Sequence, residues 1–239
     1  MNEQKALKQI ALIKTGSTIE QIKPVHGDFE DWFAEGMGVL DLLQIDVYKQ
    51  QALPPAESLA GVVITGSPAM VSAGEDWSER TAEWLEKTVK KGTPVLGVCY
   101  GHQLLAHALG GKAGPNPAGR QIGTVTVELS DGSEDDPLLG YLPRTFAAQT
   151  SHSEAVLELP TGAERLATSP LDNNFAIRYA ENVWGLQFHP EFSGIVMSEY
   201  IRCRSDAIRE EGLNPQQLID KITETLEAKS LLRKFVELL

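Results

Sequence analysis

The sequence is poor in basic residues and in long apolar runs, and both shortages limit what the protein can be. It has 21 Lys and Arg residues against 33 Asp and Glu residues, and therefore a formal net charge of −12. Nucleic acids and anionic membrane surfaces bind basic surfaces, so neither is expected as a partner. No apolar run approaches the roughly 18 residues of a membrane-spanning helix. A small-molecule substrate or a protein partner is expected instead.

Cysteine is also scarce, with Cys99 and Cys203 the two occurrences in 239 residues. The first residues show neither a long apolar run nor a small-residue cleavage site, so a cytoplasmic, reducing compartment is expected. A disulfide between the two cysteines stays open at this point. Groups of His, Cys, Asp and Glu with zinc-site spacing are missing, as is a glycine-rich phosphate-binding loop. The sequence therefore predicts no metal and no cofactor.

A junction between a strand and a helix at Cys99 is the most informative feature present. The apolar run 95–98 ends at Cys99, and a helical pattern follows at once. Gly97 and Gly101 flank the cysteine with the spacing of a nucleophile elbow, a turn too sharp for side chains at those two positions. The following helix points its free N–H groups at the sulfur. We therefore expect a nucleophile rather than a buried structural cysteine, which would leave the glycines unexplained.

Strand and helix patterns alternate through the first half of the chain, which predicts an α/β fold with a mostly parallel central sheet flanked by helices. Asp76 is expected to cap a helix that ends at Gly92. Ligands of such sheets bind beyond the carboxyl ends of the strands, so Gly66-Ser67 and Cys99-Tyr100 should face one crevice. The expected strands are 10–13, 45–48, 61–65 and 94–99.

Beyond Gly111 strands follow one another without helices between them, so extra antiparallel strands are expected. The acidic stretch 131–136 is expected to be a solvated loop, since it lacks the ligand spacing of a calcium loop. The expected strands are 121–129, 146–149, 155–159, 175–179 and 183–188, of which the last two form a hairpin.

The C-terminal part of the sequence has helical patterns. Asn214-Pro215 is expected to start a helix whose apolar stripe contains Leu218, Ile222 and Leu226, and a short helix follows. We expect a single domain over residues 1–239, with a core of about 10–195. The helical extension 196–239 is expected to pack on that core.

A base for the thiol is offered by His189-Pro190-Glu191. In an extended chain His189 and Glu191 lie on the same side, and the proline prevents a helix. Glu191 can then accept a hydrogen bond from one imidazole nitrogen while the other faces Cys99. A histidine that merely ends a strand is the alternative, and the elbow at Cys99 makes it the weaker one.

The motifs Gly-Val-Cys-Tyr-Gly-His-Gln and Gln-Phe-His-Pro-Glu together resemble those of the class I (triad) glutamine amidotransferase family. The resemblance covers about residues 10–191 in motif order, and it implies that family's flavodoxin-like fold. It also implies a catalytic triad of Cys99, His189 and Glu191 that attacks the side-chain amide of glutamine. Ammonia leaves, a γ-glutamyl thioester forms, and water releases glutamate.

Further site residues follow from the same resemblance. The backbone N–H groups of Ser67 and Tyr100 would form the oxyanion hole. Many family members have glycine in place of Ser67, so a strained backbone is expected there. Contacts to the substrate are implied for Gly66, Gln103, Ser151 and Ser153, and His152 would support the binding loop or be purely structural. His102 and His107 are expected to be packing or surface residues.

The amidotransferase pattern occupies nearly the whole sequence, which therefore has no room for a fused synthase. The overall resemblance is to stand-alone members similar to the amidotransferase domain of GMP synthase, and a separate synthase that receives ammonia is an expected partner. Two alternatives remain open. One is a γ-glutamyl hydrolase or peptidase that acts on γ-glutamyl peptides or conjugates, and the other is a non-catalytic regulatory subunit.

Overall fold

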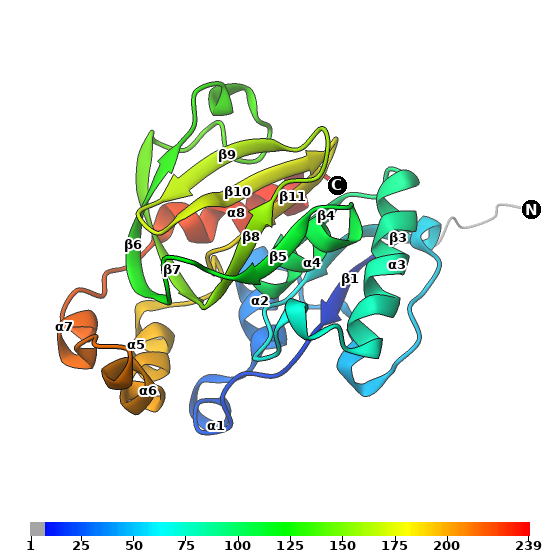
Figure 1. Ribbon diagram of the computed structural model, residues 1–239. Coiled ribbons are helices and arrows are strands. Elements are labelled where there is room, and N and C mark those ends of the chain that lie inside the picture. The colour runs from blue at the N-terminus through cyan, green and yellow to red at the C-terminus, as the bar shows by residue number, and fades with distance from the viewer. Residues whose placement is uncertain (1–7) are drawn as a thin grey trace, which may run out of the picture.

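The structure, a computed structural model, describes residues 8–239 as a large sheet, a small two-stranded sheet and the helices around them (Figure 1). The strands are β1 (Gln9–Lys14), β2 (Leu43–Asp46), β3 (Leu59–Ile64), β4 (Val95–Val98), β5 (Lys112–Pro115), β6 (Gln121–Leu129), β7 (Thr145–His152), β8 (Glu154–Glu158), β9 (Glu164–Ser169), β10 (Asp172–Ala180) and β11 (Val183–Leu186). The α-helices are α1 (Lys23–His26), α2 (Phe29–Met37), α3 (Asp76–Lys90), α4 (Tyr100–Ala108), α5 (Gly194–Cys203), α6 (Ser205–Glu210), α7 (Pro215–Ile219) and α8 (Leu226–Glu237). Short 3₁₀ helices are η1 (Val47–Lys49), η2 (Ala56–Ser58), η3 (Val71–Ala73) and η4 (Ser133–Asp135).

The large sheet has the strand order β2-β1-β3-β4-β11-β10-β9-β6-β7. Neighbouring strands are parallel from β2 to β11. From β11 to β7 they are antiparallel, and β5 pairs with β8 in the small sheet. The expected α/β fold with extra antiparallel strands is therefore confirmed. The strands β1, β3, β4 and β11 all end at the same edge of the sheet.

Helices cover both faces of the sheet and bury two apolar clusters. One cluster contains Phe33 of α2 and Phe235 of α8, and the other contains Leu85 of α3 and Leu105 of α4. Figure 1 shows α3 and α4 together on one side, with α8 behind the sheet. None of the helices within residues 8–239 is both long enough and apolar enough to cross a membrane.

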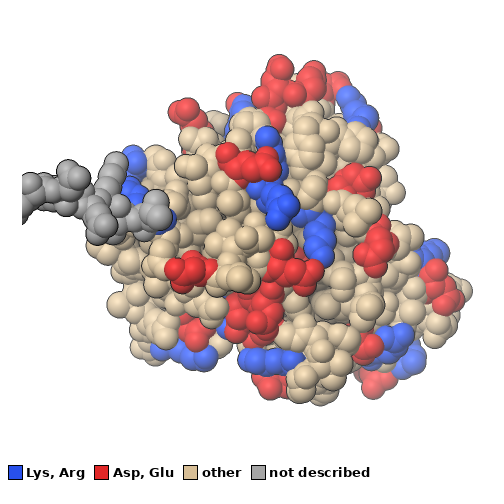
Figure 2. Space-filling view, turned by 180° about the vertical axis from the view of Figure 1, so that it is seen from behind, with Lys and Arg blue, Asp and Glu red and all other residues tan. Residues whose placement is uncertain are grey.

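The surface of one face can be followed in Figure 2, where Lys and Arg side chains lie among Asp and Glu side chains. This face has no continuous basic surface of the kind that binds nucleic acid.

Two expected features of the first half differ from the structure. The strand expected over 45–48 ends at Asp46, because the chain turns through η1 and closes the turn at Gln50, whose φ is 65°. Helix α3 has Glu75 rather than Asp76 at its N-cap, without a side-chain cap. The Glu75 carboxylate instead accepts a hydrogen bond from the Trp77 indole at 2.7 Å.

The acidic stretch is not simply a solvated loop, because Asp136 is only 4% exposed. Its carboxylate accepts hydrogen bonds from the backbone N–H groups of Leu138 and Leu139, both at 2.9 Å. The Trp184 indole donates to it at 3.1 Å. Asp136 therefore anchors this loop to β11.

The C-terminal helices also differ from expectation. Asn214 caps α7 as expected and accepts from Gln216 N–H at 3.0 Å, but α7 ends at Ile219. Leu226, expected at the end of its apolar stripe, is instead the first residue of α8 and is 68% exposed. Helix α5, which carries no strong pattern in the sequence, begins directly after the segment that contains Glu191.

Candidate active site

Cys99 forms the whole connection between β4 and α4, and its backbone is strained. Its φ of 51° and ψ of −102° are rare for a residue with a side chain, and such conformations cost about 1–3 kcal/mol. Neighbouring elements hold it there. Its N–H donates to the Leu186 carbonyl at 2.7 Å, and its carbonyl accepts from Gln103 N–H at 3.1 Å. The sulfur is thereby fixed at the N-terminus of α4.

The two glycines around Cys99 are required by close backbone approach. A Cβ on Gly97 would lie 2.5 Å from the Gly101 carbonyl oxygen. A Cβ on Gly101 would lie 2.7 Å from the carbonyl oxygen of Ile64, at the end of β3. The tight elbow expected from the sequence is therefore present, and side chains at these positions would prevent it.

His189 and Glu191 follow β11 and meet as expected, but the segment between them is not extended. Pro190 and Glu191 form a turn, in which the Phe192 N–H donates to the His189 carbonyl at 3.3 Å, and this turn brings the carboxylate to the imidazole. His189 Nδ1 lies 2.7 Å from Glu191 Oε1, and the two residues are only 3% and 4% exposed. The His189 N–H donates to the Gln149 carbonyl at 2.8 Å. The Phe192 ring stacks on the imidazole, with the ring centroids 4.1 Å apart and the planes 16° apart. These contacts leave the imidazole little rotational freedom.

The electrostatics of the pair favour a charged imidazole. Burial alone would lower the pKa of His189, but the Glu191 carboxylate and the neighbouring Cys99 side chain raise it to about 10. Gly66 lies against both residues, because a Cβ there would be 2.9 Å from His189 Cε1 and 3.7 Å from Cys99 Cβ. The structure thus brings the expected thiol, imidazole and carboxylate together at the end of β4 and β11.

A small cavity of about 40 Å³ opens beside Cys99. The residues predicted for substrate binding and for the oxyanion hole line it together, apart from Gly66. They are Ser67, Tyr100, Gln103, Ser151, His152 and Ser153.

Two of these side chains are turned inward. Gln103 Nε2 donates to the carbonyl of Glu154 at 2.8 Å and to Gln187 Oε1 at 3.0 Å. His152 Nδ1 donates to the same carbonyl at 2.8 Å, and burial lowers the pKa of His152 to about 4. These bonds fix the segment from Ser151 to Glu154. Ser151 and His152 belong to the end of β7 rather than to a separate loop.

Ser67 does not have the strained backbone that a glycine position suggested. The described residues other than glycine with positive φ are Gln50, Cys99 and Asn182. The Ser67 hydroxyl donates to the Thr15 carbonyl at 2.7 Å and accepts from Ala69 N–H at 3.1 Å. The expectation of strain was therefore wrong, because these bonds hold the loop in a conformation that a serine can adopt.

A second, larger cleft of about 570 Å³ meets the small cavity at Cys99 and also reaches His189. The loop after β1 and several aromatic side chains line it. Ser67 and Cys99, which were expected to face one crevice, both line this cleft. The rest of its wall could not be predicted, because it comes from segments far apart in the chain.

Arg204 lies at the α5–α6 junction, lines both cavities, and was also missed. It is half-buried, and its Nε has no hydrogen-bond partner among the described residues. Nor does any described carboxylate lie within 4.0 Å of its guanidinium. By contrast, the neighbouring Arg120 is bound to Glu211 through Nε and Nη2. An isolated arginine carries no pattern that could have singled it out.

The remaining histidines are structural, as expected. His102 is fully buried, donates from Nε2 to the Asn174 carbonyl at 2.9 Å, and has a pKa that burial lowers to about 3. His107 is on the surface, where its Nε2 lies 3.0 Å from Glu79. Residues 8–239 contain no group of three or more His, Cys, Asp or Glu side chains placed to hold a metal ion.

The chain is similar to several known proteins. Residues 37–202 match the family model of class-I glutamine amidotransferases. The chain is 41% identical over 141 residues to the glutamine-hydrolysing GMP synthase of Aeropyrum pernix, a match that covers 59% of this chain but only 25% of that protein. It is 27% identical over 229 residues to gamma-glutamyl peptidase 3 of Arabidopsis thaliana, covering 92% of this chain and 90% of that protein.

A solved structure of a glutamine amidotransferase from Thermotoga maritima has the same fold. It matches with a TM-score of 0.76 and 26% sequence identity over 96% of both chains. The segment matched by the family model contains Cys99, His189 and Glu191, whereas the loop after β1 and Arg204 lie outside it. The chain belongs to the class-I glutamine amidotransferase family.

Proposed function

We propose that the protein hydrolyses the side-chain amide of glutamine through a thioester on Cys99, with His189 and Glu191 as its catalytic partners. One observation carries the proposal. A cysteine on a strained elbow lies beside a buried histidine whose Nδ1 is 2.7 Å from a carboxylate, at the junction of two cavities. This arrangement is that of a nucleophile, its base and the group that orients the base.

In the first half of the reaction, the Cys99 thiolate attacks the amide carbon. The oxygen of the tetrahedral intermediate is stabilised by the N–H groups of Ser67 and Tyr100, the latter at the N-terminus of α4. His189, which holds its other proton toward Glu191, donates a proton from Nε2 to the leaving nitrogen. The C–N bond breaks and ammonia departs, which leaves a γ-glutamyl thioester on Cys99.

In the second half, water attacks the thioester. His189 is now neutral and accepts a proton from that water, and the C–S bond breaks to release glutamate. Glu191 keeps the imidazole in its orientation and stabilises its charged form throughout. The stack with Phe192 restricts the ring to the same plane.

The glutamyl part of the substrate is proposed to bind at the small cavity and to extend over the residues that this cavity shares with the larger cleft, because about 40 Å³ alone is too little for it. Gln103 and the backbone of Ser151 and Ser153 contact its amino-acid end, and His152 supports this segment from inside. Arg204 pairs with its α-carboxylate, because an unpaired, half-buried guanidinium in a chain of net charge −12 is a suitable anion receptor. Gly66 provides the space that the acyl group needs.

A second activity is hydrolysis of γ-glutamyl peptides by the same thioester chemistry. It is favoured by the similarity to an Arabidopsis gamma-glutamyl peptidase, which extends over 92% of this chain. The similarity to GMP synthase favours the first activity, and there a synthase that takes up ammonia is the expected partner.

The test is an assay of the purified protein with glutamine for release of glutamate and ammonia. Cys99→Ala is expected to abolish the release, whereas Cys203→Ala, which changes an exposed thiol, is the matched control. A glutamine-analogue electrophile should label Cys99. Turnover that survives Cys99→Ala would exclude the proposed nucleophile, and an unreactive Cys99 would favour a regulatory subunit instead.

A further inference from the structure

The cleft of about 570 Å³ is placed where the leaving group of the reaction must go. The two cavities share Cys99, but only the larger one is lined by His189. Since His189 protonates the leaving nitrogen, that nitrogen points into the larger cleft when the glutamyl part occupies the smaller cavity. The substituent on the leaving nitrogen therefore enters the larger cleft.

This space is far larger than ammonia requires. A molecule of that size occupies about 30 Å³ in a liquid, whereas the cleft measures about 570 Å³. Ligand pockets of roughly 300–1,000 Å³ hold whole small molecules. The size of the cleft suits a leaving amine with a substantial side group.

Aromatic side chains form much of the wall of the cleft. They are Phe29, Tyr48, Trp77 and Tyr200. The Trp77 ring stacks on Tyr100 with the centroids 5.6 Å apart, and the Tyr200 hydroxyl lies 2.7 Å from Thr18 Oγ1. Aromatic walls of this kind favour a flat apolar ligand group.

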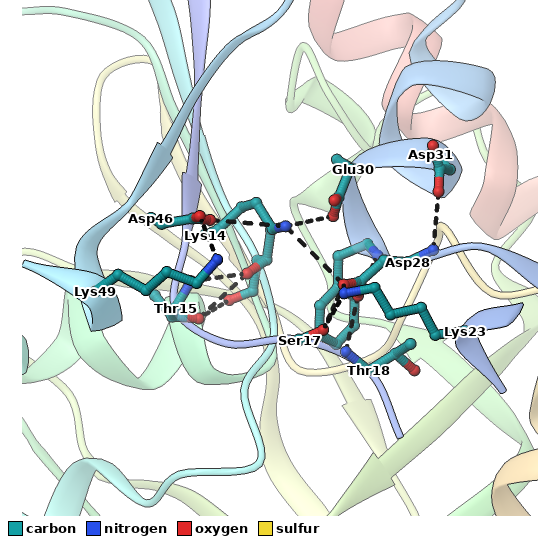
Figure 3. A network of polar contacts seen from close by, with 12 residues as sticks. Lys14, Thr15, Ser17, Thr18, Lys23, Asp28, Glu30, Asp31, Asp46 and Lys49 are labelled. Carbon is teal, nitrogen blue, oxygen red and sulfur yellow. Dashed lines mark hydrogen bonds and ion pairs between the residues drawn. The ribbon is translucent and has the colours of Figure 1, made fainter. Parts of the chain in front are cut away.

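The loop after β1, which closes one side of the cleft, is held in place by a buried carboxylate. Asp28 is 1% exposed, accepts from Thr18 N–H at 2.7 Å, and hydrogen bonds with the Ser17 hydroxyl. Lys23 pairs with it at 2.9 Å, and Lys14 reaches towards it from β1 (Figure 3). The cleft is thus formed before a ligand binds.

The charges of the cleft select against an acidic leaving group. Glu20 and Glu75 lie in its wall, and its cationic side chains are Arg204 and the charged imidazole of His189. Arg204 also lines the small cavity, where it is assigned to the substrate's α-carboxylate. With that pair formed, and with the His189 imidazole paired with Glu191 at 2.7 Å, Glu20 and Glu75 leave the rest of the cleft with negative charge, which disfavours a second carboxylate.

We infer that this cleft is a leaving-group subsite and that the enzyme hydrolyses γ-glutamyl amides of aromatic amines that lack a carboxylate. The inference rests on the thioester chemistry of the proposed function. Cys99 attacks the amide carbon, the C–N bond breaks, and His189 protonates the amine as it leaves. Water then cleaves the thioester, so one amide and one water give glutamate and one amine.

The test compares kcat/KM of the full chain for four substrates: γ-glutamyl-phenethylamide, γ-glutamyl-ethylamide, γ-glutamyl-phenylalanine and glutamine. The phenethylamide is expected to exceed the ethylamide and glutamine by at least about 10-fold, because its ring is buried against the aromatic wall. It should also exceed γ-glutamyl-phenylalanine, whose carboxylate meets Glu20 and Glu75. Equal or lower values for the phenethylamide would overturn the inference.

Variants of the wall provide the second arm. Trp77→Ala and Tyr48→Ala, made separately, should each lower the ratio of kcat/KM for the phenethylamide to kcat/KM for the ethylamide by about 5-fold or more. Trp84→Ala is the matched control, since Trp84 lies on the same helix but donates its indole N–H to Pro54 at 2.8 Å, outside the cleft. Unchanged ratios in both wall variants would contradict the subsite.

Failure of this inference can be told apart from failure of the proposed function. Glutamine turnover that depends on Cys99, without preference for the aromatic amide, would reject the subsite and leave the proposed function standing. No turnover of any of the four substrates, with Cys99 inert to the electrophile, would reject both.

Discussion

The His189 imidazole is held in its charged form by the groups around it. Its pKa is raised to about 10 mainly because the Glu191 carboxylate and the Cys99 side chain outweigh the effect of burial. A raised pKa keeps the acid form available for the leaving nitrogen far above the ordinary value of 6.5. Activity should therefore persist to alkaline pH and fall as His189 loses its proton.

Glu191→Gln tests this coupling. The amide keeps the shape of the side chain but removes the charge that raises the pKa of His189, so the alkaline limb of kcat/KM should move to lower pH. The rate at neutral pH is expected to fall by about 10²–10⁴-fold, because the imidazole loses its orienting carboxylate. A pH–rate profile measures both effects. An unchanged alkaline limb would mean that Glu191 does not control the charge of His189.

Arg204→Met tests the proposed anion receptor. Loss of a charge-assisted pair with the substrate's carboxylate, worth about 1.5–3 kcal/mol, should raise KM for glutamine by about 10- to 100-fold with a much smaller effect on kcat. The control is Arg209→Met on the next helix, whose side chain is 62% exposed and pairs with Asp206. Equal KM values in the two variants would remove Arg204 from the binding site.

The sequence predicted some site residues well and others not at all. The elbow at Cys99 could be predicted because it needs glycines two positions away, and the proximity of His189 and Glu191 because they are two residues apart. The turn at Pro190 and Glu191 that brings the two side chains together, in place of the expected extended segment, could not be predicted. Arg204 could not be predicted, since its position depends on how α5 packs. The unstrained backbone at Ser67 was also unpredictable, because it depends on a hydrogen bond to Thr15 on another strand.

At the level of elements, Asp28 connects the N-terminus of α2 to the loop after β1, which forms part of the wall of the leaving-group cleft. Asp28 caps α2 by accepting from Phe29 N–H at 2.8 Å, and it accepts from Thr18 N–H in the loop after β1. Burial alone would raise the pKa of Asp28, but the hydrogen bonds from Ser17, Thr18 and Lys23 lower it below its usual range. The ionised form is therefore the one that stabilises the fold.

Asp28→Asn should destabilise the protein by about 1.5–3 kcal/mol, because it removes the buried charge that accepts hydrogen bonds from Ser17, Thr18 and Lys23. Since the pKa of Asp28 is lower in the folded state, its contribution is present above the unfolded-state value of 3.8 and is lost as the pH falls through the lower folded-state value. Urea unfolding at several pH values measures this. Glu35→Gln, at a carboxylate 71% exposed on the same helix, should change stability by less than about 0.5 kcal/mol.

Element boundaries were predictable where local signals were strong. Strand β6 and the end of α3 near Gly92 follow directly from alternation and a glycine stop. The strand predicted over 45–48 ends at Asp46 instead. The alternation of apolar and polar residues continues into η1, but the strand pairing with β1 has ended there. The Leu218–Ile222–Leu226 stripe failed because helical spacing persists across the break between α7 and α8.

For the whole molecule, we propose that residues 8–239 form one domain with the C-terminal helices as part of its core; residues 1–7 of the domain expected from the sequence lie outside the described residues. Helix α8 buries Phe235 completely, with its ring 6.3 Å from that of Trp184 on β11. Trp184 lies next to β4 in the sheet register, opposite Leu96. Packing of the C-terminal helix is thus linked to the strand that carries Cys99.

Phe235→Ala should lower the free energy of unfolding by about 3–5 kcal/mol, as expected for a large cavity in a packed core. Leu226→Ala, at the exposed first residue of the same helix, is the control and should have little effect. In a Cys203→Ala background, exposure of Cys99 to a thiol reagent and loss of circular dichroism should follow one common urea transition. Two separate transitions would argue for a C-terminal unit that unfolds on its own.

The position of β11 has a consequence for synthesis of the chain. Cys99 leaves the ribosome before His189, and at about 5–20 residues per second the interval over the 90 residues between them is roughly 5–18 s. Because β11 inserts between β4 and β10, the imidazole reaches the sulfur only after this central strand has been made. The nascent protein therefore carries the proposed nucleophile without its proposed base, and the two meet only when the sheet has closed.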